Sequence, residues 1–262
     1  MSDPTRSSGR TPFIAGNWKM HTTANECVAL CRAVREHIDA IEGVEKAICP
    51  PFPFLGEAKA ALAGSSVLLG AQNVHWEAQG AYTGEVSPAM LQGLVDYAIV
   101  GHSERRQYFC ETDETVNRKL KATLAHGLTP IFCVGETREE REAGRTEEVL
   151  ARQVRRGLEG VPWADTCVIA YEPVWAIGTG LAASGEQANE TIGFIRRLVA
   201  EAFSPALAEA TRIQYGGSVK ADNVAEFLTQ PEIDGALVGG ASLDVEAFAI
   251  IVGQAAEAKA RA

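Results

Sequence analysis

The chain alternates short apolar runs with longer segments of helical periodicity, and this alternation constrains the fold more than any other feature. The runs are rich in Val, Ile, Leu, Ala and Cys, as is typical of strands buried on both faces of a parallel sheet. They lie at Phe13–Gly16, Lys46–Cys49, Val67–Ala71, Tyr97–Gly101, Pro130–Val134, Cys167–Tyr171, Arg212–Tyr215 and Ala236–Val238. Their starts are about 32 residues apart on average, the length of one strand–helix unit.

The segments between the runs carry helix start signals. Thr23–Glu26 and Ser184–Gln187 match the capping box, and Ser87 precedes a proline suited to the first helical position. No linker rich in Gly, Ser or Pro divides the chain, so we expect a single domain over residues 11–262 behind a polar tail, residues 1–10. Eight strand–helix units in about 250 residues predict a closed α/β barrel, (β/α)8, of eight parallel strands. A doubly wound open sheet is the alternative, because periodicity does not distinguish the two.

Charge and hydropathy narrow the function classes. The 262 residues include 24 Lys and Arg against 34 Asp and Glu, a formal net charge of −10. An acidic chain is poorly suited to nucleic acid or an anionic membrane, because both require a basic surface. No apolar run reaches the roughly 18 residues of a membrane helix, and the first ten residues lack the apolar core of a secretory signal. We therefore expect a soluble, cytoplasmic protein.

The six cysteines indicate neither a disulfide scaffold nor a metal site. They form no C-x-x-C pair, and the chain has no H-E-x-x-H motif. Five of them lie within apolar runs or helical stripes: Cys27, Cys31, Cys49, Cys133 and Cys167. We expect these to pack in the core, and we predict no bound metal.

Polar residues and glycines gather directly after the predicted strands. They are Asn17 and Lys19 after the first run, Gln72 and Asn73 after the third, His102 and Glu104 after the fourth, Glu136 after the fifth, Glu172 after the sixth, Gly216–Ser218 after the seventh and Gly239–Gly240 after the eighth. The carboxyl ends of barrel strands meet at one face, where barrel enzymes build their sites. A turn or a cap explains any one of these residues, but together they predict an active site at this face.

Three of these residues favour particular chemistry. Glu172 lies between an apolar run and Pro173, so we expect a partly desolvated carboxylate with a raised pKa, suited to a general base. His102 suits an electrophile or an acid–base catalyst. Lys19 either neutralises a substrate anion or pairs with Glu104. The glycines after the sixth to eighth runs suit phosphate binding by backbone N–H groups, although tight turns also require glycine.

A match to G-x-G-x-x-A at residues 178–183 suggests a dinucleotide site, but its context argues against one. The first glycine of a dinucleotide loop follows its strand almost directly. Here the segment Glu172–Ile177 intervenes. The chain also contains no G-x-x-x-x-G-K-[ST] phosphate loop. We therefore predict no nucleotide cofactor.

Five motifs, in order along the chain, resemble the triosephosphate isomerase family from about Phe13 to Lys259. They are Asn17–Met20, Gly101–Arg106, Ala170–Gly180, Tyr215–Val219 and Leu237–Leu243. The resemblance implies a TIM barrel that interconverts dihydroxyacetone phosphate and D-glyceraldehyde 3-phosphate through an enediolate, without cofactor, in glycolysis and gluconeogenesis. This family is a standard worked example of pKa tuning in catalysis.

The resemblance also implies roles for individual residues. Glu172 is similar to the base that moves a proton between C1 and C2, and His102 to the neutral imidazole that polarises the carbonyl. Asn17 and Lys19 resemble the electrostatic partners of substrate and enediolate. Glu104 is similar to the carboxylate that pairs with the lysine. The remaining implied positions are a supporting Ser103 and the phosphate-binding Gly178, Ser218, Gly239 and Gly240.

Two loops are expected to have special functions by the same resemblance. Residues 173–179 resemble a lid over the phosphate, and Thr83 resembles the tip of a third loop, Trp76–Glu85, that docks into the second subunit of a homodimer. That loop is longer than a usual βα connection of 2–6 residues. The end of the lid reads Leu181–Ala183, where the family commonly has a basic residue followed by a small β-branched one.

Two other functions remain open from the sequence. A Schiff-base aldolase on a similar barrel would act on sugar phosphates, but the position after the sixth strand is Glu172 and not a lysine. A catalytically silent barrel could serve as a binding protein. The intact set of Asn17, Lys19, His102 and Glu172 favours the isomerase over both.

Overall fold

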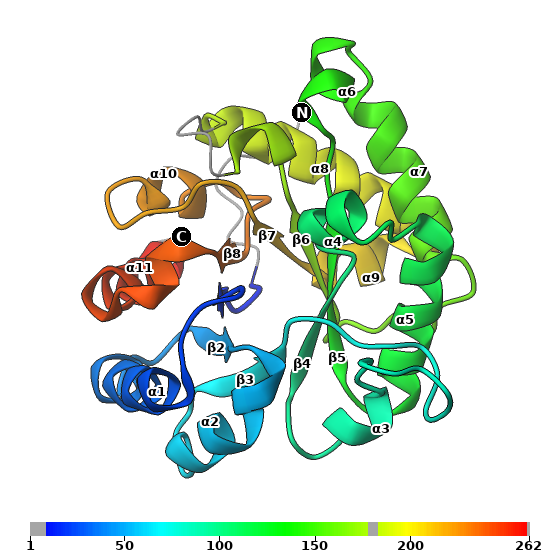
Figure 1. Cartoon of the computed structure of the whole chain (residues 1–262). Coiled ribbons are helices and arrows are strands. Elements are labelled where there is room, and N and C mark those ends of the chain that lie inside the picture. The colour runs from blue at the N-terminus through cyan, green and yellow to red at the C-terminus, as the bar shows by residue number, and fades with distance from the viewer. Residues whose placement is uncertain (1–8, 178–182, 261–262) are drawn as a thin grey trace.

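Eight parallel strands close into a barrel (Figure 1). The computed structural model describes residues 9–177 and 183–260. The strands are β1 (Phe13–Asn17), β2 (Glu45–Cys49), β3 (Leu68–Ala71), β4 (Tyr97–Val100), β5 (Thr129–Val134), β6 (Val168–Tyr171), β7 (Arg212–Tyr215) and β8 (Gly235–Val238). They follow one another in chain order, and β1 pairs with both β2 and β8. The predicted (β/α)8 barrel is therefore confirmed, and the open-sheet alternative is wrong because the two end strands pair.

Helices surround the barrel on its outside (Figure 1). They are α1 (Ala24–Ile38), α2 (Leu55–Ala61), α3 (Pro88–Leu91), α4 (Ser103–Tyr108), α5 (Asp113–Ala125), α6 (Arg138–Glu142), α7 (Thr146–Leu158), α8 (Gly185–Ala202), α9 (Pro205–Ala210), α10 (Val224–Leu228) and α11 (Val245–Ala260), with the short 3-10 helices η1 (Phe52–Phe54), η2 (Val174–Ala176) and η3 (Gly240–Leu243). Ser184 Oγ accepts the Gln187 N–H at 3.2 Å, as the capping box predicts. None of the described helices is long and apolar enough to cross a membrane.

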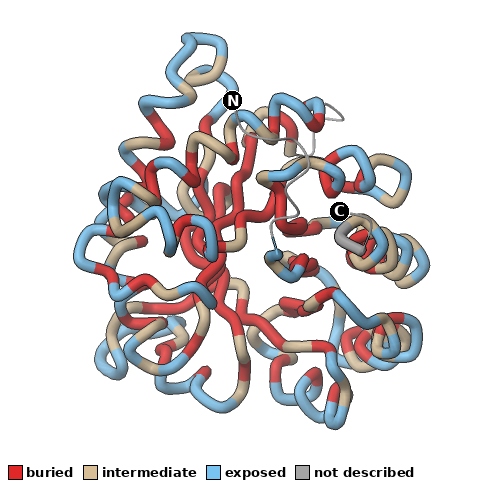
Figure 2. The backbone as a smooth tube through the Cα atoms, turned by 180° about the vertical axis from the view of Figure 1, so that it is seen from behind, coloured by how far each residue is buried: buried red, intermediate tan, exposed pale blue. Residues whose placement is uncertain are grey.

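The core has two layers, one inside the barrel and one between the strands and the helices. Along β1, Phe13 and Ala15 belong to the inner cluster and Ile14 to the outer one, and all three are fully buried. Figure 2 shows buried backbone concentrated along the strands. Because neighbouring residues of a strand enter different layers, both faces are apolar, and this explains the nearly continuous apolar runs.

The prediction that five cysteines pack in the core is confirmed. Cys27, Cys31, Cys49, Cys133 and Cys167 are buried, and Cys110 is exposed. All six are free thiols.

The amino end of the barrel is filled by stacked rings and charged groups. Phe13 stacks on Tyr97 with ring centroids 4.6 Å apart, and the Arg212 guanidinium lies 5.1 Å from the Phe13 ring centroid. Arg212 also pairs with Glu45 at 3.0 Å. Arg10, the last residue of the predicted tail, forms a 2.7 Å ion pair with the buried Asp234. These contacts leave the carboxyl end of the strands as the place where a site can open.

Candidate active site

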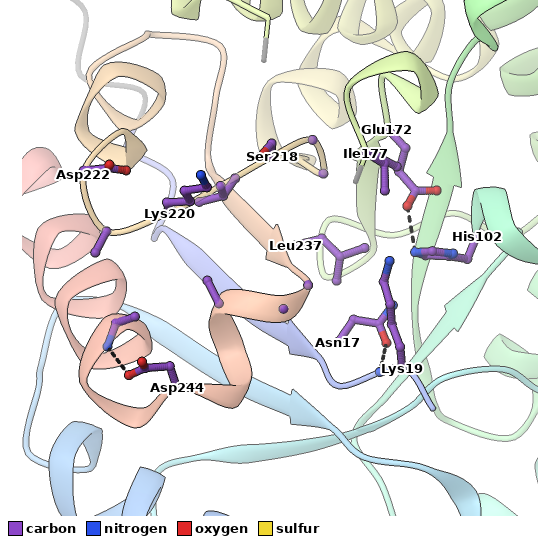
Figure 3. Close-up of a pocket in the computed structure, with 18 residues that line it drawn as sticks. Asn17, Lys19, His102, Glu172, Ile177, Ser218, Lys220, Asp222, Leu237 and Asp244 are labelled. Carbon is purple, nitrogen blue, oxygen red and sulfur yellow. Dashed lines mark hydrogen bonds and ion pairs between the residues drawn. The ribbon is translucent and has the colours of Figure 1, made fainter. Parts of the chain in front are cut away.

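A cavity of about 670 Å³ opens at the carboxyl ends of the strands, and most of the predicted site residues line it. The predicted residues on its wall are Asn17, Lys19, His102, Glu172, Ser218, Gly239 and Gly240. Figure 3 shows Glu172 and His102 facing each other across one side of the cavity, with Lys19 beside them and Ser218 on the other side. The strands therefore bring together residues that are more than 220 positions apart in the sequence.

Glu172 and His102 are in direct contact. Glu172 Oε1 lies 2.9 Å from His102 Nε2, and Glu172 Oε2 accepts the Ser103 backbone N–H at 2.8 Å. The Glu172 residue is 1% exposed, and His102 is 6% exposed. Because both oxygens of the carboxylate have partners, Glu172 is fixed over the centre of the site before substrate arrives.

The pKa of Glu172 differs from the expectation. Burial alone raises the pKa of this carboxyl. The facing His102, the Ser103 N–H and the nearby Lys19 outweigh burial and lower the pKa of Glu172 below its usual value. The prediction of a raised pKa is wrong for this arrangement, because the chain order does not show which groups from the fourth strand face the sixth.

His102 lies immediately before α4 and accepts a hydrogen bond from the backbone of that helix. Its Nδ1 accepts the backbone N–H of Glu104 at 3.2 Å, so the proton of the neutral imidazole resides on Nε2, toward Glu172. Burial lowers the pKa of His102, but the Glu172 and Glu104 carboxylates raise it more, and the net direction is upward. The proton on Nε2 therefore faces Glu172 on the cavity wall and can be donated there.

Lys19 is held in an unusual backbone conformation by its neighbours. Its φ is +53°, a left-handed value that favours glycine. The Lys19 N–H donates to Asn17 Oδ1 at 3.0 Å, and the Gln72 side chain donates to the Lys19 carbonyl at 2.8 Å. The Lys19 ammonium pairs with Glu104 Oε1 at 2.5 Å. Backbone strain that is supported from several sides is typical of functional positions.

The far side of the cavity is built from the loops after β7 and β8. Gly240 begins η3, and a Cβ added there would meet no atom within 4 Å, so its backbone borders open space. Ser218 is braced by Asn223, whose side chain donates to the Ser218 carbonyl at 3.0 Å. The start of a short helix next to a glycine pair is a suitable place for an anion. Gly178 and Thr179 lie outside the described residues, as do Leu181 and Ala182 of the predicted hinge.

Gln72 and Glu136, which follow strands but had no predicted role, are positioning residues. Gln72 supports the Lys19 backbone, as described above. Glu136 is fully buried and accepts a hydrogen bond from Trp175 Nε1 at 2.9 Å and one from Tyr171 OH at 3.1 Å. It thereby fixes η2, the first part of the predicted lid. Their position directly after a strand was the available signal, but it does not distinguish support from catalysis.

The third loop leaves the barrel as an exposed arm. Residues 78–85 are all exposed, Thr83 among them, and Tyr82 is 43% exposed. Its base is ordered by rings: His75 lies 4.1 Å from Trp76 and 4.5 Å from Tyr82, centroid to centroid. Thr83, at the tip of the loop, is therefore exposed, while the neighbouring Tyr82 ring packs on the buried His75.

The described residues contain no group of three or more His, Cys, Asp or Glu side chains placed to hold a metal ion. Fold and site together define an enzyme of the (β/α)8-barrel class, with a carboxylate and an imidazole in contact beside a lysine. A family model described as triosephosphate isomerase matches residues 12–255.

Similar proteins agree with this match. Over 246 residues the chain is 56% identical to the triosephosphate isomerase of Carboxydothermus hydrogenoformans. The aligned residues make up 93% of this chain and 98% of that isomerase. It is 53% identical to the triosephosphate isomerase of Clostridium perfringens and 52% identical to that of Alkaliphilus metalliredigens, each over 93% of this chain and 99% of the other. The chain therefore belongs to the triosephosphate isomerase family, and the predicted enzyme class, an intramolecular aldose–ketose isomerase, is confirmed.

Proposed function

We propose that Glu172 and His102 carry out the isomerisation of dihydroxyacetone phosphate to D-glyceraldehyde 3-phosphate as base and electrophile. The observation that carries this proposal is their contact, 2.9 Å between Glu172 Oε1 and His102 Nε2, on the wall of a cavity that Lys19 also lines. A base and an acid that lie this close can act on adjacent atoms of one small substrate.

The proton transfer balances without any external reagent. Glu172 removes a proton from C1, and the carbonyl oxygen on C2 becomes an enediolate oxygen that accepts a hydrogen bond from His102 Nε2. The hydroxyl proton on the C1 oxygen then moves to the C2 oxygen by way of His102, which gives its Nε2 proton to the C2 oxygen and takes the proton from the C1 oxygen. The same carboxyl returns the carbon proton to C2 as the oxygen on C1 becomes the carbonyl. The Glu172–His102 hydrogen bond must open during binding, because the reacting carbons have to come between the two groups.

Lys19 and Asn17 stabilise the negative charge that develops. A fixed ammonium in a partly buried site stabilises an oxyanion far better than water does. The Lys19 ammonium is anchored by Glu104, and Asn17 fixes the Lys19 backbone. Ser103 is a positioning residue, since its N–H orients the Glu172 carboxylate.

The phosphate group is proposed to bind at Ser218, Gly239 and Gly240, with Gly178 as the fourth position. The open space in front of Gly240 and the start of η3 support this placement. In the same proposal, residues 173–179 close over the phosphate and exclude water, which protects a reactive intermediate.

We further propose a homodimer that forms through the third loop. Large apolar side chains are exposed around the site: Met20 is 94% exposed, Tyr108 67% and Phe109 64%. Exposed apolar side chains of this size, in a chain whose third loop also protrudes, are typical of an interface. The third loop of a second copy, with Thr83 at its tip, is proposed to cover them.

We also propose a division of the chain into two parts and a location in the cell. They are the division into a tail, residues 1–10, and a barrel domain, residues 11–262, and a cytoplasmic location. Six free thiols are compatible with a reducing compartment, because disulfides form mainly in oxidising ones. Cell fractionation with an antibody against the chain tests the location.

A turnover experiment without auxiliary reagents tests the function. NMR spectroscopy follows dihydroxyacetone phosphate in D₂O with the purified protein and excess EDTA as the only additions. We expect conversion to D-glyceraldehyde 3-phosphate, with deuterium entering the carbon that receives the proton. Activity that disappears with EDTA and returns with zinc or magnesium would contradict the cofactor-free proposal. Borohydride trapping of a covalent substrate adduct would favour an aldolase instead.

A further inference from the structure

Lys220 is an exposed lysine on the rim of the active-site cavity, and the catalytic proposal does not use it. It lies two residues after Ser218, on the loop that follows β7. Figure 3 places Lys220 beside Ser218, across the cavity from Lys19. Both lysines line the cavity, but they differ in their partners.

Among the described residues, the Lys19 charge is neutralised by an ion pair, whereas the Lys220 charge is not. The Lys19 ammonium pairs with Glu104 at 2.5 Å. Nothing in the described parts of the chain, residues 9–177 and 183–260, forms an ion pair with Lys220. An unpaired ammonium on the rim of a cavity attracts an approaching anion more strongly than one that is paired.

The charges around the cavity otherwise oppose an anionic substrate. Its charged lining residues are Lys19, Lys220, Glu172, Asp222 and Asp244, a formal sum of 2 − 3 = −1. The whole chain has a formal charge of −10. A triose phosphate carries about two negative charges at neutral pH, so its approach requires a local positive field.

The loop that carries Lys220 is held by three hydrogen bonds to side-chain groups. The Lys220 N–H donates to Asn223 Oδ1 at 2.8 Å, and Asn223 Nδ2 donates to the Ser218 carbonyl at 3.0 Å. From α11, Gln254 Nε2 donates to the Ala221 carbonyl at 3.1 Å. The Lys220 backbone is therefore anchored in the same loop as Ser218, one of the proposed phosphate positions.

We propose that Lys220 recruits the phosphate dianion of the substrate to the cavity through long-range electrostatic attraction. Its effect lies in the encounter and not in the chemical step, so it acts on kcat/KM and leaves kcat unaltered. Asp222, on the same rim, opposes it. This inference rests on the proposed function, because it takes a triose phosphate as the ligand.

The test compares charge variants at two salt concentrations. At about 10 mM ionic strength the Debye length is ~30 Å, and the field of Lys220 extends over the whole cavity mouth. We expect Lys220→Gln to lower kcat/KM for D-glyceraldehyde 3-phosphate about threefold and Lys220→Glu about tenfold. Near 1 M salt the Debye length is ~3 Å, and the variants should converge with the wild type.

Three further variants separate electrostatics from damage to the loop. Lys220→Arg should restore the wild-type value, and Asp222→Asn should raise kcat/KM at low salt, which loop damage cannot do. Lys59→Gln removes the same charge from an exposed site on α2, outside the cavity, and should match the wild type.

Competition by inorganic phosphate gives a second readout that does not depend on catalysis of the variant. Its inhibition constant should rise for Lys220→Gln at low salt by a factor similar to the change in kcat/KM. A loss for Lys220→Gln that persists near 1 M salt, or a salt dependence equal to that of the wild type, would overturn the proposal. A wild-type chain without isomerase activity would instead contradict the proposed function.

Discussion

At the scale of single residues, the site depends on pairs that the chain order does not reveal. The sequence places His102 after the fourth strand and Glu172 after the sixth, but it does not show that the two side chains meet at 2.9 Å. Their contact reverses the expected shift in the pKa of Glu172. Positions of site residues were therefore predictable from the positions of the strands, whereas electrostatics required the distances between side chains.

The coupling between these two residues gives a prediction for the pKa of His102. Burial lowers that pKa, and the Glu172 carboxylate is the first of the groups that raise it. We expect Glu172→Gln to lower the pKa of His102, because it removes a negative charge next to the imidazolium. Titration of the His102 ring by NMR in both proteins measures the change. An unchanged or higher pKa in the variant would show that Glu172 does not hold the proton of His102.

At the scale of elements, the strands were more predictable than their connections. Every predicted run overlaps an observed strand, because burial on both faces leaves a strong apolar signal. The support given to β3 by α1 left no comparable signal. Asp39 follows α1, and its carboxylate accepts hydrogen bonds from Ser66 N at 2.6 Å and from Ser65 Oγ at 3.0 Å. Hydrogen bonds between segments that are distant in the sequence depend on how the two segments pack in space.

Asp39 supplies a pH-dependent contribution to stability. Hydrogen bonds from Ser66 and Ser65 lower the pKa of Asp39 to about 2 from an ordinary value of 3.8. A lowered native pKa stabilises the fold above the unfolded value, and the stabilisation is lost as the pH falls through the native one. We expect Asp39→Asn to lower the urea midpoint by a constant amount from pH 7 to pH 5.

The same difference between wild type and variant should shrink below about pH 3.8. Urea titrations at several pH values, followed by circular dichroism, provide the comparison. A difference that grows as the pH falls would contradict this account of the α1–β3 connection. Glu36→Gln, an exposed change in the same helix, serves as the control for charge alone.

At the scale of the whole molecule, the closed barrel places the site beside exposed apolar side chains. Met20 directly follows Lys19, so a partner that covers Met20 would also restrict the loop that carries the lysine. The proposed dimer is therefore expected to support catalysis and not only stability. The sequence predicted a long third loop with aromatic residues, but a single chain does not show its partner.

Thr83→Glu tests this link between assembly and activity. A charge that loses its water at an interface without a partner costs several kcal/mol. We expect the variant to have a higher dimer dissociation constant, measured by sedimentation, and a kcat that falls in parallel. Thr83→Ser should retain both. A wild-type protein that is fully active as a monomer at micromolar concentration would refute the proposed role of the loop.

The central claim is that Glu172 moves the proton, and one substitution tests it most directly. Glu172→Gln keeps the size of the side chain and removes the base. We expect kcat to fall by at least about 10²- to 10⁴-fold, the usual contribution of one general base. The affinity for inorganic phosphate, measured in the same sample, should stay within about tenfold, because a base acts in the transition state. A Glu172→Gln protein that binds phosphate and turns over at a near wild-type rate would contradict the account.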